Sequence, residues 1–294
     1  ANGQLVAADG YIGPAVGGLI YAAHPASVYV FTATLLGISA LTLSRVRRVL
    51  PPPTEVRRHP LREMADGLQF TWRERFLFGT ITRDLFAVIL SGATAMLPVY
   101  ARDILHIGAD GLGHLRAAPA LGAVAMAFLF SWKPLRTEVG RKMLRAVAGF
   151  GVATIVFGLA GPVLTAMFGP TMVGSEISPA VLLSLLALFA LGAADMVSVY
   201  VRQSLIQLYT PDDMRGRVGA VSTLFISGSN ELGEAESGFL AAMVGPVIAV
   251  VGGGIGAVLV TFLWARIFPE LARARTFDPP ESFEFTPVPE NKKD

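Results

Sequence analysis

The sequence predicts an all-α membrane protein with about eight transmembrane helices. Charged residues make up 16% of the 294 residues and apolar residues 53%, whereas soluble domains carry about 25% charged residues. Eight apolar runs reach roughly the 20 residues that a helix needs to cross a bilayer. These runs occupy residues 3–22, 26–44, 77–100, 112–132, 143–168, 179–201, 216–244 and 246–268.

The positive charge of the connecting segments alternates along the chain and predicts the topology. Arginine and lysine gather in segments 45–75, 133–145 and 202–217 and in the tail, whereas the intervening loops hold only Arg102. Basic loops remain on the cytoplasmic side of a membrane. An even number of spans then places both ends of this chain in the cytoplasm.

The segment 45–76 is expected to be a cytoplasmic linker that contains an amphipathic helix. Three prolines at 51–53 end the preceding helix, and apolar residues then recur at helical spacing. These residues are Leu61, Met64, Ala65, Leu68 and Trp72. Such a helix either lies on the membrane surface or packs as a soluble linker helix. The tail 269–294 is rich in proline, glutamate and lysine and is expected to be disordered.

An internal repeat relates the first helix pair to the last pair. An offset of 220 residues, with one later insertion, aligns Gly13 with Gly233, Gly18 with Gly238, Pro25 with Pro246 and Arg45 with Arg266. Parallel repeats of helical halves are typical of secondary transporters. Residues 1–44 would then be the last two helices of an N-terminal half, and 77–268 a six-helix C-terminal half. Four helices, in roughly 140 residues, are expected to precede Ala1.

Three motifs resemble the major facilitator superfamily. Gly13-Pro14 with Gly17-Gly18 resembles the antiporter motif of the superfamily's fifth helix. The loop Val139-Gly140-Arg141-Lys142 resembles the second copy of its cytoplasmic loop signature, although the aspartate of the fuller signature is missing. The stretch from Thr210 to Val218 resembles the loop before the eleventh helix in the drug- and siderophore-exporter branch, the enterobactin-exporter-like branch. The resemblance covers residues 1 to about 270.

This resemblance implies a partial major facilitator superfamily fold equivalent to helices 5–12. The implied function is proton-coupled efflux of a small, drug- or siderophore-like molecule by alternating access in the bacterial inner membrane. The complete protein is expected to be a monomer that uses the proton gradient and no cofactor. Two alternatives remain: a lysophospholipid or lipid flippase on the same scaffold, and a non-transporting membrane partner module.

The motif residues have structural explanations as well as functional ones. Gly13 and Gly17 form a small-xxx-small pair that permits close helix packing, and Pro14 and Gly18 complete a possible bend that limits leakage. Thr210 is expected to cap a helix in which Pro211 is first and Asp213 third. The same loops supply candidates for cytoplasmic salt links that close an inward gate: Arg141, Lys142, Asp212, Asp213, Arg215 and Arg217.

Ionisable residues inside spans are the candidates for coupling to protons or substrate, because they are costly in a bilayer. Asp195 lies within an apolar run, and Arg202 follows seven residues later on nearly the same helix face. The pair could couple transport to protons or simply form a structural ion pair. Asp84, beside Arg83, is buried if its helix starts at Phe76 and interfacial if it starts at Leu85; we expect the interfacial position.

A polar cluster in the seventh run is the candidate lining of a cavity. It comprises Asn230, Glu231, Glu234 and Glu236. Three glutamates within six residues cannot face lipid, so they would line a wet cavity for cationic or polar substrates or lie near the extracellular end.

Several function classes are excluded or not expected. The chain has no cysteine, so thiolate and iron–sulfur chemistry are excluded. His106 and His114 are too far apart in sequence to predict a metal site. The chain carries neither a G-x-S-x-G elbow nor a G-x-x-x-x-G-K phosphate loop, so neither an enzyme nor an ATP-driven pump is expected. The basic residues flank apolar runs, so no nucleic-acid partner is expected.

Overall fold

The structure is a computed structural model that describes residues 25–45, 60–90, 92–168, 178–211, 214–274 and 276–277. Every element in these ranges is helical. The elements are α2 (Pro25–Ser44), α3 (Pro60–Arg73), α4 (Arg75–Leu90), η1 (Ala93–Met96), α5 (Leu97–Val99), η2 (Tyr100–Ile104), α6 (Gly108–Trp132), α7 (Val139–Phe168), α8 (Pro179–Leu208), α9 (Arg215–Val244), α10 (Pro246–Ile267) and α11 (Pro269–Arg273). The first expected helix, which contains Gly13, Pro14, Gly17 and Gly18, lies outside the described residues.

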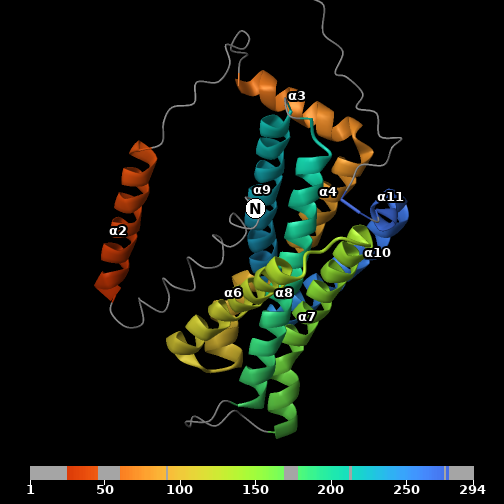
Figure 1. The fold of residues 1–294 in the computed structure, drawn as a ribbon. Helices are drawn as coiled ribbons and strands as arrows, with labels where there is room; N and C mark the ends of the chain where they lie inside the picture. Colours follow the sequence, from red (N-terminus) through yellow and green to blue (C-terminus); the bar gives the residue numbers. More distant parts are fainter. Residues whose placement is uncertain are drawn as a thin grey trace, which may run out of the picture.

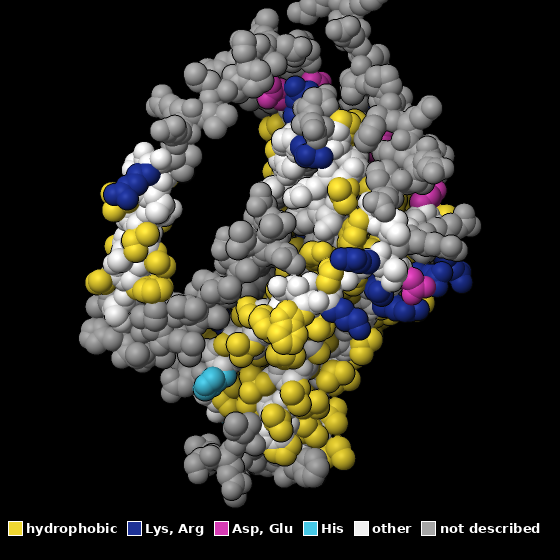
Figure 2. Space-filling view, in the orientation of Figure 1, with side chains coloured by type: hydrophobic (Ala, Val, Ile, Leu, Met, Phe, Trp, Pro, Cys, Tyr) yellow, Lys and Arg dark blue, Asp and Glu magenta, His cyan; other side chains and the backbone are white. Residues whose placement is uncertain are grey.

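Five described segments are long and apolar enough to cross a membrane: Phe76–Ile104, Gly111–Trp132, Val139–Leu164, Pro179–Leu208 and Pro246–Ile267. These five lie among the described residues alone, and the first predicted span lies outside them, so they do not count against the eight that the sequence predicts. In α2, the apolar stretch Tyr29–Ser44 is shorter than the five. The helix α9 has 30 residues but is not among the five. On the face drawn in Figure 2, hydrophobic side chains cover the lower part of the bundle, and Lys and Arg side chains lie above them.

The helices α4 and α6 to α10 form one bundle, with α3 across one end and α2 standing apart (Figure 1). Within the bundle α7 packs against both α8 and α10, α6 packs against α8, and α4 packs against α9 and α10. Glycine makes two of these contacts unusually close. A Cβ at Gly192 of α8 would overlap the carbonyl oxygen of Pro119 in α6, and one at Gly151 of α7 would lie 2.7 Å from that of Gly254 in α10. Small residues at helix crossings are typical of membrane bundles.

The first of the five spans is not one continuous α-helix. After α4 the chain continues as the 3₁₀ turn η1, the short α5 and the π-helical η2. The irregular backbone brings Tyr100 into the core, where its side chain is 0% exposed and its hydroxyl donates a hydrogen bond of 3.0 Å to the Gly158 carbonyl. The prediction of an uninterrupted helix over 77–100 is therefore wrong in its C-terminal part.

Two other boundaries differ from expectation. The helix α8 continues to Leu208, so Arg202 is a buried helical residue and not part of a loop. The segment 269–273, expected to be disordered, forms α11. Its Leu271 is fully buried, and the Gly140 amide donates to the Ala274 carbonyl at 3.0 Å. Apolar contacts with α4 and α7 therefore order the start of the tail.

The helix α9 begins later than its predicted cap. Its first residue is Arg215 and its N-cap is Met214, which makes no side-chain capping hydrogen bond. The Thr210 hydroxyl instead donates to the Ile206 carbonyl in the preceding helix. Thr210 therefore closes the end of α8 and does not cap α9. The Gly245 turn between α9 and α10 has a φ of 90°, which only glycine adopts readily.

Candidate functional site

A layer of buried charge lies between α4 and α8. Arg83, Asp84 and Arg202 are 0%, 7% and 3% exposed, respectively. The interfacial position expected for Asp84 is wrong, because α4 begins at Arg75 and carries Asp84 into the bundle. Buried charges in a membrane protein are costly unless they are paired, so the contacts in this layer decide what it can do.

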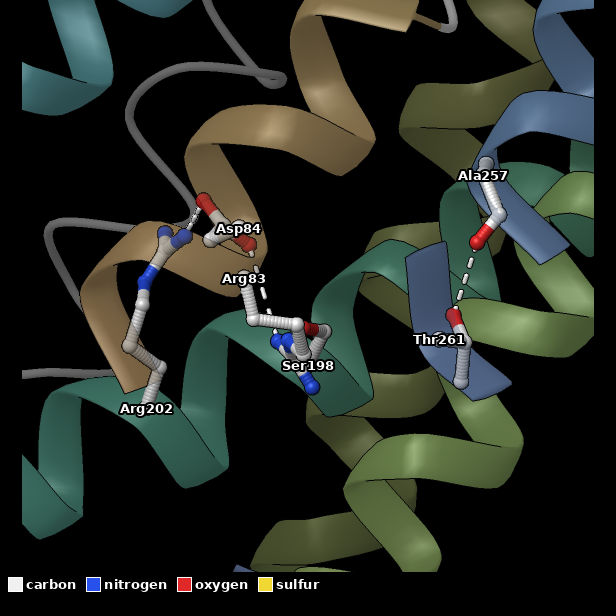
Figure 3. Close-up of polar contacts among 6 residues, drawn as sticks. All are labelled: Arg83, Asp84, Ser198, Arg202, Ala257 and Thr261. Atoms are coloured by element: carbon white, nitrogen blue, oxygen red, sulfur yellow. Dashed lines mark hydrogen bonds and ion pairs between the residues drawn. The ribbon is translucent and has the colours of Figure 1, made fainter. Parts of the chain in front are cut away.

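The charges of this layer are matched across the two helices (Figure 3). Arg202 of α8 forms an ion pair with Asp84 of α4. Arg83 points to α8, where its Nη2 donates a 2.7 Å hydrogen bond to the Ser198 hydroxyl; the same nitrogen lies 3.7 Å from Asp84 Oδ1. Asp195, half-buried on α8, is close enough for its charge to attract Arg83. The layer thus holds two arginines and two aspartates.

The sequence identified half of this arrangement. Asp195 and Arg202 were predicted as one site and do lie on one side of α8, but the ion pair of Arg202 is with Asp84 and Asp195 acts on Arg83. Arg83 and Ser198 were missed as functional residues. The spacing 195, 198 and 202 corresponds to i, i+3 and i+7, a single helix stripe. This stripe, together with the Arg83-Asp84 dipeptide in another span, is the sequence pattern that could have identified Arg83 and Ser198.

A narrow crevice joins the charged layer to α9. It is lined by Ile81, Asp84, Leu85, Arg202, Ser222, Phe225, Ile226 and Ser229, and the space between these side chains has no room for a water molecule. The crevice is therefore not a substrate chamber, but it places two α9 hydroxyls beside the Asp84–Arg202 pair.

The predicted polar cluster of α9 is divided between two sides of the helix. Asn230, Glu231 and Glu234 are exposed, whereas Glu236 is half-buried and accepts a long hydrogen bond of 3.5 Å from the Ser237 hydroxyl. The buried side packs on α4: a Cβ at Gly233 would lie 2.8 Å from the Val88 carbonyl oxygen. Glu236 therefore does not share the exposed face of the other three.

The predicted gate residues that the structure describes make local contacts. Arg141 pairs with Glu138 at 3.0 Å, and Lys142 Nζ lies 3.5 Å from the Thr137 hydroxyl. Arg215 Nε donates to the Gln207 carbonyl at 3.0 Å, and Arg217 Nη1 contacts Met214 Sδ at 3.2 Å. Asp212 and Asp213 lie outside the described residues. The gate therefore stays a prediction.

A metal site finds no support in the part of the chain that the structure covers. No group of three or more His, Asp or Glu side chains there could hold a metal ion. His106 lies just after the C-terminal end of the first span, where its Nδ1 is 3.0 Å from the Arg102 carbonyl oxygen.

Comparison with known proteins identifies the family. The family model described as Major Facilitator Superfamily matches residues 7–233. The chain is 26% identical over 277 residues to the enterobactin exporter EntS of Escherichia coli O1:K1 / APEC, which covers 91% of this chain and 60% of the relative. It is 27% identical over 273 residues to the protein of that name from Citrobacter koseri, with coverage of 90% and 59%. No solved structure matches.

The chain thus spans about 60% of the length of the curated relatives it matches. The predicted family and the predicted all-α membrane fold are both confirmed, because the family model covers most of the chain and the described elements are helical. The chain is a multi-pass membrane protein of a transporter family and not an enzyme. It belongs to the Major Facilitator Superfamily.

Proposed function

We propose that this chain works in proton-coupled export of a small, drug- or siderophore-like molecule across the bacterial inner membrane by alternating access. The family supports transport, and the relatives named as exporters support the outward direction. The complete transporter would be a monomer, with substrate between two helical halves near the membrane midplane. The proton gradient would supply the energy, because ATP-binding loops are not expected.

The observation that carries this proposal is the position of Asp195 within the charged layer. The carboxylate is half-buried and close enough for its charge to attract Arg83, which contacts Ser198 and Asp84. Protonation of Asp195 would remove its attraction for Arg83 and leave the layer with one excess positive charge. The Arg83 side chain would then favour a different set of partners. A proton can thereby bias the packing of α4 against α8, as coupling requires.

The exposed face of α9 supports a polar lining for the transport path. Asn230, Glu231 and Glu234 are exposed on α9, whereas Gly233 packs on α4. Carboxylates are expensive against lipid, so this face would line a wet cavity in the complete transporter. Its negative charge favours cationic or polar substrates.

The test is the substitution Asp195→Asn in the complete transporter, expressed in cells that lack other exporters for the test compound. We expect loss of resistance and of proton-driven efflux in everted vesicles, with unchanged protein in the membrane. Asp103→Asn is the matched control, because Asp103 is exposed at the outer end of the first span and pairs with Arg102; it should retain efflux. Normal efflux in Asp195→Asn would refute the proposal.

A further inference from the structure

The helix α3 exposes an apolar stripe on the side that faces away from the bundle. Met64, Leu68 and Trp72 are 41%, 36% and 64% exposed, and their spacing of four residues places them along one side of the helix. Exposed large apolar side chains in a row are unfavourable in water. The stripe therefore needs an apolar surface to cover it.

The opposite side of α3 is fixed to the bundle, so the helix cannot rotate to bury the stripe. Phe70 and Thr71 are 4% and 2% exposed. A Cβ at Gly67 would lie 2.9 Å from the carbonyl oxygen of Arg217 at the start of α9, which shows how closely the two backbones approach. The contact with α9 therefore sets the direction in which Met64, Leu68 and Trp72 point.

The position and charge of α3 identify what covers the stripe. The helix lies across the end of the bundle, over the ends of α9 and α4 (Figure 1), so it runs along the membrane surface when the bundle spans the bilayer. Trp72 is followed by exposed Arg73, the combination that membrane interfaces favour. Residues 57–75 hold five arginines and three acidic residues, and this positive excess complements anionic headgroups.

We propose that α3 is an interfacial helix. Its Met64–Leu68–Trp72 stripe inserts into the boundary between headgroups and acyl chains of an anionic bilayer leaflet. Through the Gly67–Arg217 contact, this insertion holds the beginning of α9 at a fixed depth. The proposal concerns the helix and the lipid surface and does not depend on the transported substrate.

The absence of cysteine from the sequence allows a direct test. Single variants Met64→Cys, Leu68→Cys and Trp72→Cys in the complete protein would carry a spin label in nanodiscs of phosphatidylethanolamine and phosphatidylglycerol. We expect the labels to collide with oxygen and to be protected from a water-soluble nickel chelate. Gln69→Cys is the matched control, since Gln69 is exposed on the adjacent side; its label should collide with the chelate several-fold more often than the label at 68.

Equal chelate accessibility at positions 68 and 69 would overturn the proposal. A second measurement leaves α3 unchanged: Trp132→Phe and Trp264→Phe make Trp72 the sole tryptophan, and brominated lipids should then quench most of its fluorescence. Absence of quenching would also overturn insertion. Replacing phosphatidylglycerol with phosphatidylcholine should raise chelate accessibility at 68 at least twofold. An unchanged value would refute the preference for anionic lipid.

Discussion

The charged layer between α4 and α8 and the outer face of α9 carry ionisable residues in opposite ways. In the layer, Asp84 and Arg202 are buried and paired. On α9, Glu231 and Glu234 are exposed, and no ion pair is recorded for either within the described residues. A buried charge needs an ion-pair partner because an unpaired charge in the interior lowers stability strongly. An exposed carboxylate is solvated by water and needs no such partner.

This difference in burial indicates that a carboxylate can take two roles in a membrane protein. The α4–α8 layer joins two helices and, in the proposed function, responds to a proton. The α9 face has no such partner among the described residues and, in the proposed function, lines the transport path. Substitutions should therefore affect stability strongly in the layer and weakly on α9.

The largest effect is expected from Arg202→Met. The substitution leaves Asp84 buried beside a single remaining arginine, Arg83, 3.7 Å away. Removal of one partner from a buried pair costs about 3–5 kcal/mol, which unfolding in detergent would measure. The double variant Asp84→Asn/Arg202→Met should recover most of that loss. Equal loss in the single and double variants would show that the pair is not what stabilises this contact.

A smaller effect is expected from Ser198→Ala. Arg83 loses the acceptor that its Nη2 contacts at 2.7 Å, and a buried donor without an acceptor costs about 1–3 kcal/mol. The control is Ser227→Ala, because Ser227 is exposed on α9; its change should stay within about 0.5 kcal/mol. If both variants unfold alike, Ser198 does not stabilise Arg83 and the layer is less specific than its geometry suggests.

On α9 we expect a change in transport with little change in stability. Glu234→Gln removes a charge from the exposed face, and its free energy of unfolding should change by less than about 0.5 kcal/mol. Uptake of a cationic test compound into everted vesicles should fall relative to a neutral compound. Glu236→Gln, on the half-buried side, should leave this ratio unchanged. A ratio unaffected by Glu234→Gln would remove Glu234 from the path.

Glu74, at the junction of α3 and α4, is half-buried, and the smallest effect is expected from its substitution. Burial raises the pKa of its carboxyl group above the usual 4.5, so the folded protein binds this proton more tightly than the unfolded chain. The associated stability is complete below the usual pKa and is lost as pH rises through the raised pKa. Glu74→Gln should therefore melt about 1 °C higher than the original protein at pH 8.

The control for Glu74→Gln is the same melting comparison at low pH. At pH 4 the Glu74 carboxyl is protonated in most folded molecules. The original protein and Glu74→Gln should therefore melt at nearly the same temperature. Thermal unfolding between pH 4 and pH 8 tests this. A melting difference that does not vary with pH would mean that the side chain acts through its shape and not through its charge.

The sequence predicted the long helices well because apolar length alone specifies them. The observed helices α6, α7, α9 and α10 begin and end within four residues of the predicted runs. The end of α8 was missed because Arg202 looked like a loop charge, and only its contact with Asp84 explains its burial. The start of the tail was missed for a similar reason, since the contacts of Leu271 come from distant helices.

The candidate site was predicted in part. Asp195, Arg202 and Asp84 were found because a charge inside an apolar run is visible in sequence. Their pairing was not, because which carboxylate meets which arginine depends on how α4 is rotated against α8. The same limit explains Glu236: proximity in sequence grouped it with Glu234, whereas helix geometry separates residues two apart by about 200°.

The broken span from Phe76 to Ile104 has a consequence for helical phase. A 3₁₀ turn overwinds the chain and a π turn underwinds it, so η1 and η2 rotate the following side chains in opposite senses. A helical wheel drawn straight through the span therefore misplaces residues between the two breaks, although their rotations partly cancel beyond them. Insertion or deletion of one residue between Ala93 and Ile104 should be absorbed by a change of turn type, whereas the same change near Asp84 would rotate the charged layer out of alignment.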